Sequence, residues 1–223
     1  MSEEHPKKPP EESPPVPIPR WLYPFARFFI LIVMTLFGPI RIRNKHRVPK
    51  KGGLLVVANH LSDSDPPVIG YALPRQSFFM AKEELFHIRI LGKIIKFFGA
   101  FPVKRGAPDR GALKKTIDLI HAGACVVIFP EGEISEDGKL QPLLPGAVLI
   151  AKRIDAPVIC CGLIGTNRIL PCGKLIPRPA FGGVSVAFGE PRVFGKSAPD
   201  EEVLNWMENE LRQLTGQTKE NLG

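Results

Sequence analysis

Residues 124–129, ACVVIF, indicate the fold more clearly than any other stretch of the chain. The run is short, apolar at every position and rich in β-branched side chains, and it stops at Pro130. A strand buried inside a sheet has this composition, because both of its faces meet apolar neighbours. We therefore expect a buried central strand here.

Other short apolar runs repeat the pattern on both sides of it, and segments with helical spacing separate them. The expected strands are Leu54–Ala58, Ser77–Ala81, Ala100–Lys104, Pro157–Ile164 and Val184–Phe188. The expected helices are Asp65–Ala72, Ile88–Phe98, Arg110–Ala122, Ala147–Ile154 and an amphipathic helix beginning after Ser197. This alternation predicts an α/β fold, a single domain with a central mixed, largely parallel sheet flanked by helices. In such sheets, sites form where the strands end.

Length and charge limit the possible functions. With 223 residues, 44% hydrophobic and 23% charged, the chain is long enough for one well-buried domain, expected over residues 41–216. A formal charge of +8 favours an anionic partner: a nucleic acid, a membrane surface or a phosphorylated substrate. The four cysteines lack the spacing of a zinc site, so we expect mostly buried, reduced thiols and no metal.

The N-terminal region divides into two parts of different composition. Residues 1–19 hold seven prolines and almost no large apolar side chain, which predicts a disordered tail. Residues 20–40 are almost entirely apolar, with Arg27 near one end, where its side chain can snorkel. We expect a membrane-associating helix that is half inserted in the bilayer, because Pro24, Gly38 and Pro39 shorten it. A tilted span and a buried core helix are the alternatives.

A basic stretch follows this apolar segment. Residues 41–51 hold six cations and no acid. An apolar anchor followed by cations is a two-signal arrangement for stable attachment to an anionic membrane, and it favours the cytoplasmic face, at the cell membrane if the source is bacterial. An ordinary solvated basic segment is the alternative. A nucleic-acid site is less consistent with the sequence, because no aromatic side chains alternate with these cations.

Polar residues follow three of the expected strands. His60 and Asp65 follow the first, and an aspartate at a helix start can orient the imidazole as a general base. Lys104 and Arg105 end the third strand, where they can bind a phosphate. Glu131 and Gly132 follow residues 124–129 in a tight turn. Taken singly, each group is also consistent with a structural or solvated role.

Their order and spacing resemble the glycerolipid acyltransferases, the family of 1-acylglycerol-3-phosphate acyltransferases. The blocks that carry the resemblance are NHxxxxD at Asn59–Asp65, a Gly-to-Arg block at Gly99–Arg105, FPEG to Ser at Phe129–Ser135, and an apolar block at Ala156–Ile159. It covers about residues 40–195. One departure concerns the third block, where the family commonly has Thr-Arg after Glu-Gly and this chain has Glu133 and Ile134.

The resemblance implies a transferase of phospholipid biosynthesis with catalytic residues His60 and Asp65. It would move a fatty acyl group from acyl-CoA or an acyl-carrier protein to 1-acylglycerol 3-phosphate, without a cofactor. Lys104, Arg105, Glu131 and Gly132 would bind the acceptor, and the missing arginine would leave more of the anion binding to Arg105. Another lysolipid or glycerol 3-phosphate is the alternative acceptor. A non-enzymatic membrane adaptor, a lipid hydrolase and a nucleic-acid-binding protein are the alternatives from other classes.

Overall fold

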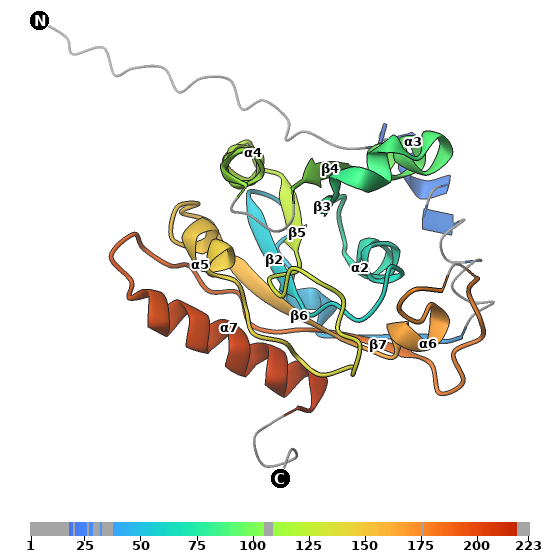
Figure 1. Ribbon diagram of the computed structural model, residues 1–223. Coiled ribbons are helices and arrows are strands. Elements are labelled where there is room, and N and C mark those ends of the chain that lie inside the picture. The colour runs from blue at the N-terminus through green and yellow to red at the C-terminus, as the bar shows by residue number, and fades with distance from the viewer. Residues whose placement is uncertain are drawn as a thin grey trace, which may run out of the picture.

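The computed structural model describes residues 18–19, 21–25, 27–28, 32, 38–104, 109–174 and 176–217. A seven-stranded sheet forms its centre, in the order β1-β7-β6-β2-β5-β3-β4 (Figure 1). Neighbouring strands are parallel except for the antiparallel pair β6 and β7. The strands are β1 Ile40–Arg43, β2 Leu54–Ala58, β3 Phe78–Lys82, β4 Ala100–Val103, β5 Cys125–Ile128, β6 Val158–Ile164 and β7 Val184–Phe188. The predicted mixed, largely parallel sheet is confirmed.

Helices cover both faces of this sheet. They are α2 Asp65–Ala72, α3 Arg89–Phe97, α4 Arg110–His121, α5 Pro145–Ala151, α6 Thr166–Ile169 and α7 Asp200–Thr215, with 3-10 turns η1 Lys45–Arg47 and η2 Glu83–His87. Figure 1 shows α2 and α6 on one side of the sheet and α4, α5 and α7 on the other. The central strands are buried on both faces, which explains their uninterrupted apolar composition.

Successive side chains of β2 pack in two separate hydrophobic cores. Leu54 and Val56 of β2 pack in the cluster that includes α2, whereas Leu55 and Val57 pack in the cluster that includes α5 and α7. All four side chains are fully buried, as the alternating direction of side chains along a strand requires when helices cover both faces. Three of the four cysteines are buried here, while Cys172 is exposed, and all four are free.

The first strand is one that the sequence did not predict. Residues 40–43, IRIR, lie inside the segment expected to be an anchor and a basic patch, yet they form β1, parallel to β7. Ile40 and Ile42 pack on the core and Arg41 and Arg43 are exposed, so the period of two is that of a strand with one covered face. Gly38 and Pro39, which precede β1, are not helical, so the expected helical segment does not extend to residue 40.

The N-terminal segment is described only in part. Tyr23, Pro24, Phe25, Arg27, Phe28 and Ile32 are helical, while residues 1–17 of the expected tail lie outside the described residues. Arg27 donates from its guanidinium to the carbonyl oxygens of Leu73 and Tyr71, at 3.2 Å each. A cation is favourable at this C-terminal end of α2, so Arg27 fixes the segment to the domain. Across the described ranges, no helix has both the length and the apolar character needed to cross a bilayer.

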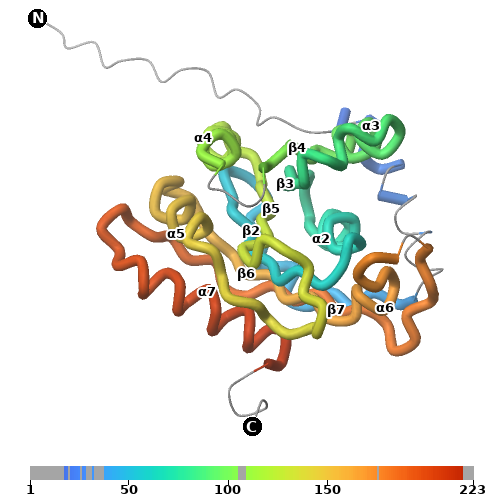
Figure 2. The backbone as a smooth tube through the Cα atoms, in the orientation of Figure 1, coloured from blue at the N-terminus to red at the C-terminus, as the bar shows by residue number. Residues whose placement is uncertain are grey.

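The strand directions decide where a site can form. Because β2, β5 and β6 are parallel neighbours, their carboxyl ends share one edge of the sheet. Figure 2 shows the loop after β5 passing over the ends of β2 and β6 before it enters α5. The loops after these three strands are therefore close enough to build one site.

Candidate functional site

His60 and Asp65 come together directly after β2. Nδ1 of His60 lies 2.8 Å from Oδ2 of Asp65, and both residues are buried. Asp65 is the first residue of α2, and Pro66 after it is well suited to the first turn of a helix. The five-residue spacing thus lets the strand end and the helix start turn the two side chains toward each other.

Backbone groups around Asp65 set the hydrogen-bonding roles of the pair. The N–H groups of Leu61 and Ser62 also donate to Oδ2, at 2.7 and 2.9 Å. Oδ2 is therefore already an acceptor of hydrogen bonds from the backbone. With Nδ1 of His60 donating to the same oxygen, Nε2 is the nitrogen with the free lone pair.

The third block holds the main chain of His60 from both sides. The N–H of His60 donates to Oε1 of Glu131 at 2.6 Å, and the N–H of Ser135 donates to the carbonyl oxygen of His60 at 2.8 Å. Oε2 of Glu131 accepts from the N–H of Gln141 at 2.7 Å. Both oxygens of Glu131 therefore accept from backbone N–H groups, one of them that of His60.

Gly132 makes the tight turn that presents Glu131. Its φ is +78°, and a Cβ at this position would lie 2.7 Å from Cδ1 of Leu144. Its N–H donates to the carbonyl oxygen of Phe129 at 3.1 Å. Any other residue here would be strained by the left-handed backbone, and the side chain of Leu144 would have to shift to make room for it.

Phe129 supports the imidazole ring. The two rings are stacked, with centroids 4.1 Å apart and an angle of 19° between their planes. The side chain of His60 is 8% exposed to solvent. Its Nε2 forms no hydrogen bond with a described residue. This nitrogen is not fully enclosed, so it stays accessible. The ring is thus held between Asp65 and Phe129.

Asn59 and the serines of the same block join it to β6 and α6. Asn59 donates from Nδ2 to the carbonyl oxygen of Leu163 at 3.0 Å and accepts from the N–H of Leu163 at 2.7 Å. The hydroxyls of Ser62 and Ser64 donate to the carbonyl oxygens of Leu170 and Thr166, at 2.7 and 3.2 Å. These links could not be predicted from local sequence patterns, because each is made to a backbone group far along the chain.

Burial raises the pKa of the Glu131 carboxyl from its ordinary value. The hydrogen bonds from the N–H groups of Gln141 and His60 and the nearby His60 ring act in the opposite direction but are outweighed. Burial disfavours the charged form, because the low dielectric of the interior solvates it poorly.

The second block lies farther from His60. Lys104 follows β4, the edge strand, and strands β5 and β3 lie between β4 and β2. Neighbouring strands are ~5 Å apart, so the backbone of Lys104 lies roughly 14 Å from β2. Lys104 lines a hollow of about 230 Å³ with Glu83, Asp109 and Lys115, and its N–H donates to Oδ2 of Asp109 at 2.9 Å. Arg105 lies outside the described residues.

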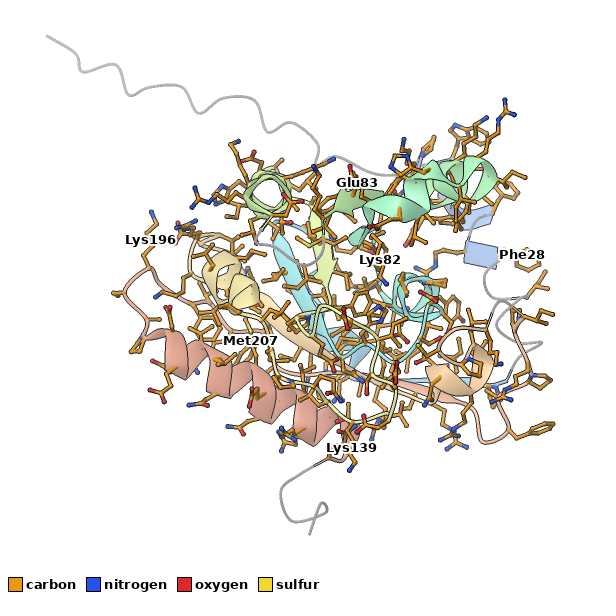
Figure 3. All side chains as sticks on the ribbon, in the orientation of Figure 1. Phe28, Lys82, Glu83, Lys139, Lys196 and Met207 are labelled. Carbon is orange, nitrogen blue, oxygen red and sulfur yellow. The ribbon has the colours of Figure 1, made fainter. Side chains whose placement is uncertain are left out.

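A further cation lies nearer to the His/Asp pair. Lys82 ends β3, one strand closer to β2 than Lys104, and its side chain is exposed (Figure 3). The sequence offered it no signal beyond a lysine at a strand end.

Known proteins are similar to this chain in sequence and in fold. The family model described as Acyltransferase matches residues 39–164, which include His60, Asp65, Lys104 and Glu131. The chain belongs to this acyltransferase family. It is therefore an enzyme of a family that transfers acyl groups, as the sequence blocks predicted.

Two curated relatives and one solved structure of another protein illustrate the similarity. The 1-acyl-sn-glycerol-3-phosphate acyltransferase of Bacillus subtilis (strain 168) is 32% identical over 86% of this chain and 94% of its own length. A protein of the same name from Streptococcus pneumoniae (strain ATCC BAA-255 / R6) is 30% identical over 90% and 76%. The crystal structure of the 1-acyl-sn-glycerophosphate (LPA) acyltransferase PlsC from Thermotoga maritima superposes with a TM-score of 0.76, covering 90% of this chain and 81% of that one, at 24% identity. It supports the fold.

Proposed function

We propose that this acyltransferase moves a fatty acyl group from a thioester, acyl-CoA or an acyl-carrier protein, to the free hydroxyl of 1-acylglycerol 3-phosphate. The observation that carries the proposal is the 2.8 Å contact between His60 and Asp65, with Nε2 of His60 left accessible. The names of the relatives from Bacillus and Streptococcus support the choice of acceptor.

In this proposal His60 acts as the general base. Nε2 takes the hydroxyl proton while the acceptor oxygen attacks the thioester carbonyl, and the C–S bond then breaks. The imidazolium returns the proton to the leaving thiolate, so the enzyme ends unchanged. Asp65 stabilises the imidazolium and keeps the tautomer. General-base help of this kind contributes about 10²–10⁴-fold.

Glu131 and Ser135 would be positioning residues in this mechanism. Since they hold the N–H and the carbonyl of His60, the imidazole enters each turnover in one orientation. A fixed base lowers the entropic cost of reaching the reactive arrangement. Lys104 and Arg105 are proposed to hold the acceptor phosphate, with Lys82 on the strand between them and Glu131.

We also propose that the enzyme works at an anionic membrane surface on the cytoplasmic side. Exposed large apolar side chains occur in the N-terminal segment at Trp21, Phe25, Phe28 and Ile32, and around α3 at Ile88, Ile90, Ile94 and Phe97. Figure 1 places both groups on the same side of the molecule, and Figure 3 shows Phe28 at its outer boundary. Apolar side chains beside cations are typical of interfacial attachment.

Helix α3 carries much of this support. Ile90, Ile94 and Phe97 recur at helical spacing on one face, with Arg89, Lys93 and Lys96 and no acid in the same nine residues. Monomeric soluble domains rarely expose such a face, whereas an anionic bilayer satisfies both its apolar and its basic parts.

The deciding experiment supplies acyl-CoA with a panel of lysolipids and with glycerol 3-phosphate, and identifies the products by mass. We expect phosphatidate from 1-acylglycerol 3-phosphate, and no product from His60→Ala. His121→Ala, which removes an exposed histidine from α4, is the matched control and should stay active.

Other outcomes would reject the proposal. Free fatty acid without an acceptor would indicate a hydrolase. A different acylated lysolipid would identify another acceptor. Membrane binding without any product would favour an adaptor.

A further inference from the structure

A basic pocket lies at the edge of the sheet, away from the His/Asp pair. It has a volume of about 310 Å³, and its lining includes Arg41 and Arg43 of β1, Arg168 of α6, and Gly182, Gly183 and Ser185 at the start of β7. Among the described residues, no acidic side chain is part of this lining. Three cations from two distant segments of the chain thus share one hollow.

The arginines of β1 are directed into the pocket by the strand itself. Arg41 and Arg43 alternate with the core residues Ile40 and Ile42, so both lie on the same face, and Arg41 is in register with Ser185. Within the described part of the chain neither guanidinium forms a hydrogen bond, an ion pair or a ring contact. Their donors remain free for an anion.

Contacts with the backbone place Arg168 at the same pocket. Its Nη1 donates to the carbonyl oxygen of Phe181 at 3.3 Å. Gly182 has φ +95°, and a Cβ there would lie 2.7 Å from Nη1 of Arg168. Only glycine lets the guanidinium lie so close to the chain. Like charges so gathered repel one another, and a phosphate accepting forked N–H groups relieves that repulsion.

The loop beside the pocket is exposed and apolar at its most prominent positions. Phe181 is 88% and Ile176 is 82% exposed, among the highest values of the large apolar side chains. Lys174 and Arg178 in the same loop are exposed as well. In Figure 1, α6 and this loop lie on the same side of the molecule as α3 and the N-terminal segment. A free phosphate has no use for Phe181 and Ile176, whereas a lipid interface does.

The pocket is also linked to the catalytic block. Arg168 lies in α6, to which Ser62 and Ser64 are hydrogen-bonded through Leu170 and Thr166. β1 and β7 begin at the sheet edge where β6 ends, because β7 is antiparallel to β6 and parallel to β1. A ligand in the pocket would therefore fix the orientation of this edge.

We propose that the arginine pocket binds the phosphate of an anionic phospholipid headgroup while Phe181 and Ile176 enter the lipid interface. This inference rests on the proposed work at a membrane surface and specifies a lipid site for it. The bound lipid is not the acceptor. It holds the domain with the carboxyl ends of β2 and β6 toward the bilayer.

The test compares two charge-matched double variants. Arg41→Gln/Arg43→Gln empties the pocket of two cations, and Arg153→Gln/Lys196→Gln removes two exposed cations elsewhere; Figure 3 shows Lys196 on the opposite side. Binding is measured by cosedimentation with phosphatidylcholine vesicles containing phosphatidylglycerol. We expect the pocket variant to bind about 25-fold more weakly, ~5-fold for each cation, and the control within roughly twofold of the native protein. Equal losses in both variants would overturn the proposal.

A label on Cys172 reports on the loop directly. This cysteine is exposed and the other three are buried, so a polarity-sensitive fluorophore attaches selectively. We expect a blue shift with anionic vesicles, and none from the same label on Lys196→Cys in a Cys172→Ser background. An unshifted Cys172 label would exclude insertion of this loop.

Two further measurements test whether the bound phosphate belongs to a lipid or to the acyl donor, and whether lipid binding is independent of catalysis. The pocket variant should keep the native KM for acyl-CoA in detergent micelles. A raised KM with native vesicle binding would assign the pocket to the donor's phosphates and overturn the lipid proposal. Because vesicle binding is measured without turnover, on His60→Ala as well as on the native protein, an absence of transferase activity would leave this result intact.

Discussion

The carboxylate of Asp65 binds the imidazole of His60 with the same oxygen that accepts the N–H groups of Leu61 and Ser62. One oxygen thus fixes the ring, the turn after β2 and the first residue of α2. Oδ1 of Asp65 is buried and bonds to none of the described residues, so the polar contacts of this carboxylate within the described residues all involve Oδ2.

Replacing Asp65 by Asn should therefore affect catalysis more than folding. If the amide oxygen takes the place of Oδ2, the ring keeps a partner, but the charge that stabilises the imidazolium is lost. We expect kcat to fall about 10²–10⁴-fold, as for the loss of general-base help. Steady-state kinetics measure the loss, and circular dichroism checks the fold.

The exposed Asp118 of α4 offers the matched control, Asp118→Asn, which should leave kcat unchanged. Near-native turnover of Asp65→Asn would rule out the proposed role of this carboxylate.

Local sequence patterns predicted most of the fold because the central strands are buried on both faces. The runs around Val56, Val127 and Ile159 are apolar throughout, and the strands were found within one residue of their ends. β1 was missed for the opposite reason: one of its faces carries Arg41 and Arg43, so its composition resembles a basic patch.

For the candidate site, the sequence showed that the residues lie at strand ends. It did not show which of them contact one another. The strand order brings His60 and Glu131 together, since β2 and β5 are neighbours. The same order places β5 and β3 between Lys104 and His60, and β3 between Lys104 and Glu131. Strand order depends on the packing of the whole domain, so no local pattern contains it.

Asn59 should matter for stability as well as for activity. Its side chain satisfies both the N–H and the carbonyl of Leu163 in the buried interior. Asn59→Ala leaves these two backbone groups without a partner, at ~1–3 kcal/mol for each buried unsatisfied group. We expect the free energy of unfolding to fall by about 2–4 kcal/mol, measured by urea denaturation. Asn167→Ala, an amide with no side-chain role in the candidate site, is the control, and equal losses would contradict this assignment.

Glu131 should give the unfolding free energy a specific pH dependence. Burial raises its pKa above the ordinary 4.5, so just above pH 4.5 the folded protein holds a proton that the unfolded chain has released. Stability from this group therefore falls as the pH rises from 4.5 to the raised pKa, and it is lost above it. Glu131→Gln removes this slope, although it also weakens one backbone contact.

Urea denaturation of both proteins at several pH values isolates the effect, because all other carboxyl groups are shared. The difference in unfolding free energy between native protein and Glu131→Gln should shrink as the pH rises through this window. A difference that is constant with pH would show that Glu131 has the same proton affinity in the folded and unfolded states.

Arg105 is proposed to bind the acceptor phosphate, and its removal should act on one substrate. A bidentate guanidinium–phosphate contact is among the stronger polar interactions, at ~1.5–3 kcal/mol for a charged hydrogen bond. Arg105→Ala should therefore raise KM for 1-acylglycerol 3-phosphate roughly 10–100-fold and change KM for the thioester little. Arg110→Ala, an exposed arginine at the start of α4, is the control. An unchanged acceptor KM would remove the role assigned to Arg105.

The exposed face of α3 should determine how tightly the enzyme holds a bilayer. Ile90 and Ile94 are 73% and 47% exposed, and one turn of helix separates them. Fully burying such a side chain contributes about 1.5–3 kcal/mol, so replacing both by Ser should weaken binding to anionic vesicles at least roughly 10-fold. Leu149→Ser/Val193→Ser removes two comparably exposed apolar side chains outside α3 and the N-terminal segment, and it should bind like the native protein. Flotation with liposomes measures both, and equal partitioning of the two variants would mean that α3 does not enter the membrane.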